Sequence, residues 1–142
     1  MANVKIKSLV DKIDETTRYM DKSFTKVILK DENITRKIGV YLIEYTSAVE
    51  EFFNRLHHRR FGNRVQQHDI LDAMKKLGVE DEFIEAMKHL KMLRNRMVHQ
   101  ISFCKPLYNY FSKSLEGLDR CQKTKGNMRL ILNVVQEEVC YL

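Results

Sequence analysis

Three side chains in one short stretch have the types that RNA cleavage without a metal ion requires. The stretch LRNRMVHQ, residues 93–100, contains Arg94, Asn95 and His99. A histidine exchanges its proton near neutral pH, so His99 could move the proton of a 2′-hydroxyl or of a leaving group. The guanidinium of Arg94 could stabilise the charge of a pentavalent phosphorane by bidentate contact. Asn95 could orient His99 or hold the phosphate, and the products would carry a 2′,3′-cyclic phosphate and a 5′-hydroxyl.

Arg94 takes a place where the helical pattern expects an apolar side chain. The steps 83–87–90–94–97–101 form an apolar seam, together with neighbouring Leu93 and Val98. A buried guanidinium without partners costs several kcal/mol, so Arg94 needs a counter-charge or a water-filled cleft. Asn95 and His99 share a flank of the helix, whereas Arg94 and His99 lie about 140° apart. We therefore expect a site built from both to need either a helix that ends near His99 or a second copy of the chain across a two-fold axis.

The positive charges are concentrated in two windows of the sequence. Lys and Arg outnumber Asp and Glu by 25 to 19, and residues 52–68 and 86–115 contain no acid at all. Such windows favour a surface for a polyanion such as RNA, although a solvated charged face without a partner is the alternative. HHRRFGNR, residues 57–64, is predicted to be a basic loop that could touch phosphate. The predicted RNA contacts are Arg59, Arg60, Arg64, Lys88, Lys91 and Arg96.

Several other classes of site lack the residues they need. The three cysteines are scattered without a CxxC pair, which is typical of a reducing compartment. His57 and His58 are adjacent and cannot chelate together on a helix, so neither a metal nor a cofactor is expected. The N-terminal residues lack an apolar signal core, and no apolar run approaches the length that crosses a membrane. A cytoplasmic protein is expected.

The hydrophobic periodicity predicts an all-α protein. Steps of three and four mark helices over about 3–29 and 33–58, with Asn33 as the expected N-cap of the second. Asp69 would cap a short helix that Gly78 ends, and a third long helix would run from about Glu80 to a break near 102–105. Pro106 fits the first turn of the next helix, KTKGN would be a turn, and 128–139 would be the last helix. We expect one domain over 1–142, an antiparallel up-and-down bundle of about four to five helices.

The motif RNRMVH resembles the Arg-x4–6-His signature of HEPN domains (higher eukaryotes and prokaryotes nucleotide-binding), in which a polar residue commonly follows the arginine. Arg94, Asn95 and His99 match it with four intervening residues. The helical pattern extends the likeness over most of the chain. The resemblance implies a metal-independent endoribonuclease that acts as a homodimer with both motifs in one cleft. It would serve as a toxin or an antiviral defence effector, and an antitoxin protein would be a further partner.

One residue departs from a branch of this family. In the HEPN toxins that are paired with a nucleotidyltransferase antitoxin, a tyrosine lies two positions after the histidine. This chain has Ile101 there. Regulation by modification of that tyrosine is therefore not implied.

Two other interpretations fit the same residues. A helical dimer, HEPN-like or unrelated, could bind RNA or a nucleotide without cutting it, and this binding would weaken with salt. A structural or adaptor bundle could instead use Arg94 as an interface residue paired with Glu44 or Glu50 on another helix. His99 would then be a cation at a helix C-terminus.

Overall fold

Four long helices and two short ones make up the described chain. The structure is a computed structural model that describes residues 2–27, 31–99, 104–111 and 114–140. Within these ranges there is no strand. The helices are α1 (Ala2–Val27), α2 (Glu32–Phe61), α3 (Ile70–Lys76), α4 (Asp81–Val98), α5 (Cys104–Tyr110) and α6 (Leu115–Cys140), with a 3₁₀ turn, η1 (Gln67–Asp69), before α3.

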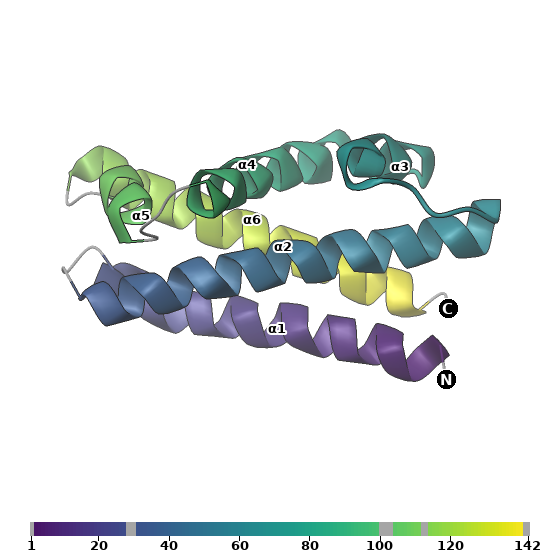
Figure 1. The fold of residues 1–142 in the computed structure, drawn as a ribbon, viewed down its shortest axis with the longest axis horizontal. Helices are drawn as coiled ribbons and strands as arrows, with labels where there is room; N and C mark the ends of the chain where they lie inside the picture. Colours follow the sequence, from purple (N-terminus) through teal and green to yellow (C-terminus); the bar gives the residue numbers. More distant parts are fainter. Residues whose placement is uncertain (1, 28–30, 100–103, 112–113, 141–142) are drawn as a thin grey trace.

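The four long helices form an antiparallel bundle, as predicted. Consecutive long helices run in opposite directions, and each of α1 and α4 packs against both α2 and α6 (Figure 1). The short helices α3 and α5 lie at the two ends of α4. The last turn of α4, which carries the RNRMVH motif, is therefore next to α5 and far from α3.

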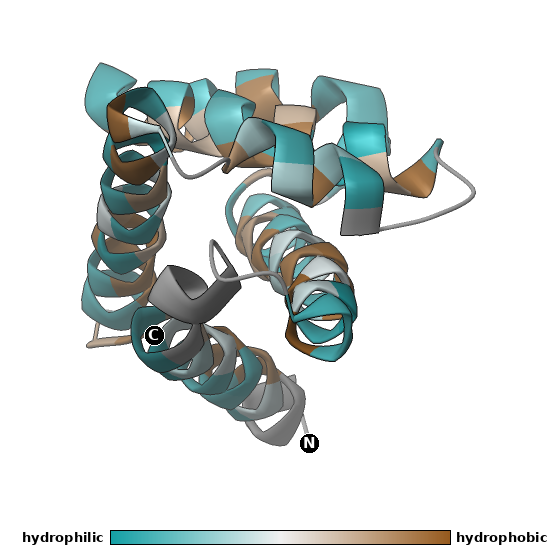
Figure 2. Ribbon diagram, turned by 90° about the vertical axis from the view of Figure 1, so that its left-hand side faces the viewer, coloured by the Kyte–Doolittle hydropathy of each residue, from teal (hydrophilic) through white to brown (hydrophobic). Residues whose placement is uncertain are grey.

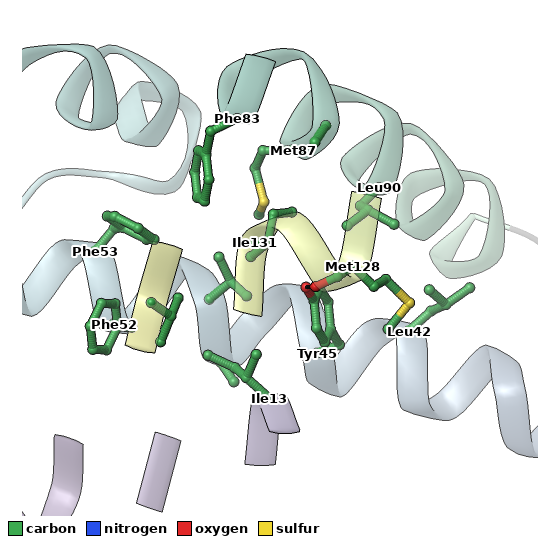
Figure 3. Close-up of a cluster of buried hydrophobic side chains, with 14 of the residues drawn as sticks. Ile13, Leu42, Tyr45, Phe52, Phe53, Phe83, Met87, Leu90, Met128 and Ile131 are labelled. Atoms are coloured by element: carbon green, nitrogen blue, oxygen red, sulfur yellow. Dashed lines mark hydrogen bonds between the residues drawn. The ribbon is translucent and has the colours of Figure 1, made fainter. Parts of the chain in front are cut away.

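The core is built from the apolar stripes that the sequence contains at helical spacing. Figure 2 shows hydrophobic and hydrophilic residues alternating along the helices. Side chains from all four long helices meet in the centre, among them Ile13, Phe53, Phe83 and Ile131, each at most 1% exposed (Figure 3). The rings of Phe53 and Phe83 lie 5.1 Å apart between centroids and join α2 to α4. This packing fixes how α4 is placed against α2.

The beginning of α2 and the region before α3 differ from the prediction. Asp31, and not Asn33, caps α2, because its Oδ1 accepts from the backbone N–H of Asn33 at 2.9 Å and of Ile34 at 3.3 Å. Asp69 stands at the N-cap position of α3, but its side chain makes no capping hydrogen bond, because η1 precedes the helix there. The basic stretch 57–64 is helical up to Phe61, so it is a loop only in its last part.

The prediction of a turn at KTKGN was wrong, because residues 123–127 are part of α6. Glycine in a helix costs about 1 kcal/mol relative to alanine, so tertiary packing must outweigh that preference. Thr124 is fully buried, and its hydroxyl donates to the Arg120 carbonyl at 2.9 Å. Burial of this turn of α6 against its neighbours keeps the helix continuous.

Candidate functional site

Arg94 is buried and paired, which confirms its expected position in the seam of α4. The residue is 7% exposed, and its Nη1 donates to Oε1 of Glu50, whose side chain is only 10% exposed. Glu50 belongs to α2, so this ion pair connects two of the long helices. The counter-charge that a buried guanidinium requires is therefore supplied within one chain.

Three more residues surround this ion pair. Oδ1 of Asn95 accepts from Arg94 Nη2 at 3.2 Å. Gln67, with its amide oxygen turned toward Arg94, accepts from Nη1 at 3.0 Å and from Nη2 at 3.2 Å. Lys91 Nζ donates to the backbone carbonyl of Gln67 at 3.4 Å. Burial and the charge of Arg94 lower the pKa of Lys91, while the carboxylate of Glu50 acts in the opposite direction. We call these five residues (Glu50, Gln67, Lys91, Arg94 and Asn95) the Arg94 cluster.

His99 lies outside this cluster, at the exposed end of α4. It is the C-cap residue, and its backbone N–H donates to the Asn95 carbonyl at 3.1 Å. In the described chain no hydrogen bond joins the side chains of His99 and Arg94. One protomer thus brings Arg94 and Asn95 together but leaves His99 one turn away, as the helical angle indicates.

Helix α4 also ends earlier than the seam suggests. Its last residue is Val98, which is 55% exposed although the sequence placed it in the apolar arc. Ile101 lies outside the described residues. The helix therefore stops at the motif, and His99 is presented to solvent.

The predicted RNA contacts do not form a single surface. Arg59 and Arg60 are in the last turn of α2 and Arg64 follows it, whereas Arg96 is near the C-terminal end of α4, at the opposite end of the bundle (Figure 1). Acids distant in sequence approach two of them, because Arg60 pairs with Glu138 at 2.9 Å and Arg64 with Glu51 at 2.7 Å. Lys88 pairs with Glu85 at 3.2 Å, and Lys91 belongs to the Arg94 cluster. The acid-free windows of the sequence are thus not free of acids in space.

A polar network that the sequence pattern did not predict joins α4, α5 and α6. His89 Nε2 lies 2.9 Å from Thr124 Oγ1, and His89 Nδ1 lies 3.5 Å from the Tyr110 hydroxyl. Thr124 already donates to the Arg120 carbonyl, so its oxygen accepts from His89 Nε2–H. The other ring nitrogen then accepts from Tyr110, which assigns a neutral tautomer protonated on Nε2. Helical periodicity indicates neighbours only within one helix, so it could not predict contacts of His89 with Tyr110 and Thr124, which are 21 and 35 positions away.

Because His89 is partly buried, we expect the stability of the fold to depend on pH. Burial, with a smaller effect of nearby Lys123, lowers the pKa of His89 below its ordinary value of 6.5. The unfolded chain therefore binds this proton more readily, so the free energy of unfolding should fall as the pH drops below about 6.5. Urea unfolding at pH 7.5 and 5.5 should show a smaller acid loss in His89→Gln than in the wild type. His68→Gln, at an exposed histidine, is the matched control, and an equal acid loss in all three proteins would contradict the assignment.

No protein-family model matches the chain, and no curated protein or solved structure matches it either. Among the described residues, no group of three or more His, Cys, Asp or Glu side chains is placed to hold a metal ion. In the same part of the chain, no helix has both the length and the apolar character needed to cross a membrane.

Proposed function

We propose that this protein is a metal-independent endoribonuclease that acts as a homodimer. The observation that carries the proposal is that Asn95 contacts both Arg94 and His99. Its side chain contacts the guanidinium of Arg94 and its carbonyl accepts from the backbone of His99, so a fixed cation and an exposed imidazole follow one another on one helix end. These are the groups that RNA cleavage by 2′-hydroxyl attack needs.

The reaction assigns a distinct role to each group. The imidazole of His99 takes the proton of the 2′-hydroxyl, whose oxygen attacks the phosphorus. The bond from phosphorus to the 5′-oxygen breaks, and a second imidazole returns a proton to that oxygen. The ends are then a 2′,3′-cyclic phosphate and a 5′-hydroxyl.

The Arg94 cluster supplies the positive charge at this end of the helix. Arg94 and Lys91 together carry two positive charges against the one carboxylate of Glu50, so the cluster keeps a net charge of +1. Glu50 and Gln67 fix the guanidinium, which removes the cost of ordering it when the phosphate arrives. Because the ion pair with Glu50 keeps Arg94 buried, the exposed amide of Asn95 makes the first contact with the phosphate. The charge of Arg94 then stabilises the phosphate from the layer below Asn95.

A second copy of the chain would supply the second imidazole. Met92, Asn95 and His99 follow one another at steps of three and four on the exposed side of α4. Met92 is 37% exposed, an apolar side chain beside polar ones. Two such faces related by a two-fold axis would place two His99 side chains in one cleft. The role as a toxin or antiviral effector, with an antitoxin protein as regulator, stays a prediction from the motif.

Cleavage of single-stranded RNA in the presence of EDTA tests the proposal. We expect the purified protein to cut the RNA, and acid treatment to open a cyclic phosphate on the 3′ ends. The 5′ ends should be substrates for a polynucleotide kinase without prior dephosphorylation. RNA that stays intact at micromolar protein, or cleavage that survives in both His99→Ala and Arg94→Ala, would contradict it.

One observation favours a second candidate, an adaptor or RNA-binding bundle without catalysis. The Arg94–Glu50 ion pair joins α2 to α4, so Arg94 has a structural use that needs no substrate. In that case Arg94→Ala would lose stability, and wild-type protein would bind RNA in a salt-dependent way without cutting it. The cleavage assay and the stability of Arg94→Ala together separate the two candidates.

A further inference from the structure

A basic cavity lies where the end of α4, the helix α5 and the start of α6 meet. Its volume is about 430 Å³, within the range of small-ligand pockets. In Figure 1, α5 is next to the last turn of α4 and the first turns of α6. The lining residues are Arg96, Lys105, Pro106, Asn109, Tyr110 and Arg120.

The charge of this lining distinguishes it from other cavities. Among the described residues, three cationic side chains line it and no carboxylate does. Three further cavities in the described part of the chain each include acids: Glu15 and Glu44 in one, Glu80, Glu82, Glu137 and Glu138 in another, and Asp69 and Asp72 in a third. Low-dielectric walls with one sign of charge concentrate the opposite ion. The occupant should therefore be an anion.

The walls of the cavity are held in place before any ligand binds. The Arg96 and Arg120 guanidinium carbons lie 5.6 Å and 5.0 Å from the centroid of the Tyr110 ring. Nη1 of Arg120 also donates to the Tyr110 carbonyl at 3.2 Å. The Tyr110 hydroxyl in turn reaches His89 of the network described above. Fixed side chains of this kind lose little freedom on binding, which favours affinity.

Lys105 provides a charge that the fold does not use. It is exposed at the rim, and in the ranges that the structure describes it forms no ion pair or hydrogen bond. Arg120, by contrast, already pairs with Glu116. The cavity therefore keeps a net positive charge of two, from Arg96 and Lys105. That matches a dianionic phosphate group.

We propose that this cavity binds the phosphate group of a small phosphorylated ligand, with room for a molecule of nucleoside monophosphate size. Arg96 and Arg120 present planar guanidinium groups that suit bidentate contact with phosphate oxygens, and Lys105 adds a point charge. Asn109 offers an amide donor at the same cavity. The assignment does not depend on RNA cleavage, because Lys105, Asn109 and Arg120 have no part in the proposed reaction.

Calorimetric titration of the full chain with three probes tests the proposal. Inorganic phosphate and a nucleoside monophosphate should both bind and compete with each other, whereas the corresponding nucleoside should not bind. A higher affinity for the nucleoside monophosphate assigns a nucleotide, and equal affinities assign phosphate alone. An RNA oligonucleotide with a 5′-hydroxyl should not displace them, since its internal diesters carry one charge each.

Charge-removing variants locate the site. Lys105→Ala and Arg96→Ala should each weaken phosphate binding about tenfold, the effect of one lost charge-assisted hydrogen bond. Lys105→Glu should abolish binding, and because the residue is exposed, the thermal melt of this variant should match the wild type. Arg36→Ala removes an exposed arginine from a cavity that contains acids, and should bind phosphate as the wild type does. No phosphate binding at millimolar concentration, or equal weakening in Arg36→Ala and Lys105→Ala, would overturn the proposal.

Discussion

Replacing Glu50 by alanine is expected to lower the free energy of unfolding by about 3–5 kcal/mol. The substitution leaves the guanidinium of Arg94 buried at 7% exposure without its carboxylate. Lys91 lies close by, so two like charges would also face each other without compensation. Urea unfolding followed by circular dichroism at neutral pH measures the loss.

An exposed ion pair on α4, the helix that carries Arg94, supplies the control for this experiment. Glu85→Ala breaks the exposed ion pair with Lys88 and should cost no more than about 1 kcal/mol. The double variant Glu50→Leu, Arg94→Met should recover most of the stability, because apolar side chains of similar volume can replace a buried pair. A loss in Glu50→Ala as small as that in Glu85→Ala would show that the pair is unimportant for stability.

The position of Arg94 could be predicted from the sequence, but its partner could not be chosen. Its place in the seam follows from the helical angle, and a buried arginine requires a carboxylate on a facing helix. Both Glu44 and Glu50 satisfied that requirement. The structure selects Glu50, while Glu44 pairs with Lys12 of α1 at 2.7 Å. The choice depends on how α4 lies along α2, which the contact of Phe53 with Phe83 fixes and no local pattern encodes.

Long-range pairing also explains why the basic windows were a poor guide to a surface. Charge windows count neighbours in sequence, but Arg60 meets Glu138 from the end of α6, 78 positions away. At the cavity beside α5, packing instead brings a further cation to residues of a basic window. Arg96 and Lys105 come from one window, and Arg120 reaches them only because α6 begins next to α5. The helices and their apolar faces are local properties that periodicity predicts, whereas both charge arrangements arise from packing.

Replacing His99 by alanine is expected to reduce RNA cleavage by about 10²–10⁴-fold, the usual contribution of a positioned acid or base. The effect should appear in kcat, because an exposed imidazole that moves a proton adds little to binding of the substrate. Unfolding by urea should be unchanged, since His99 is exposed and its described hydrogen bond is made by its backbone. His68→Ala, at another exposed histidine, should cleave as the wild type does. Equal cleavage by His99→Ala and the wild type would remove the histidine from the mechanism.

Mixing the two proteins tests whether one cleft uses both copies. If two His99 side chains act together, an equal mixture of wild type and His99→Ala that has exchanged subunits should retain about one quarter of the wild-type rate at the same total concentration, because that share of dimers has two intact copies. If one imidazole per dimer suffices, about three quarters should remain. A value of one half, the simple average, would indicate that each protomer works alone. The last result would leave Arg94, Asn95 and His99 of a single chain to form the site, which their separation on α4 argues against.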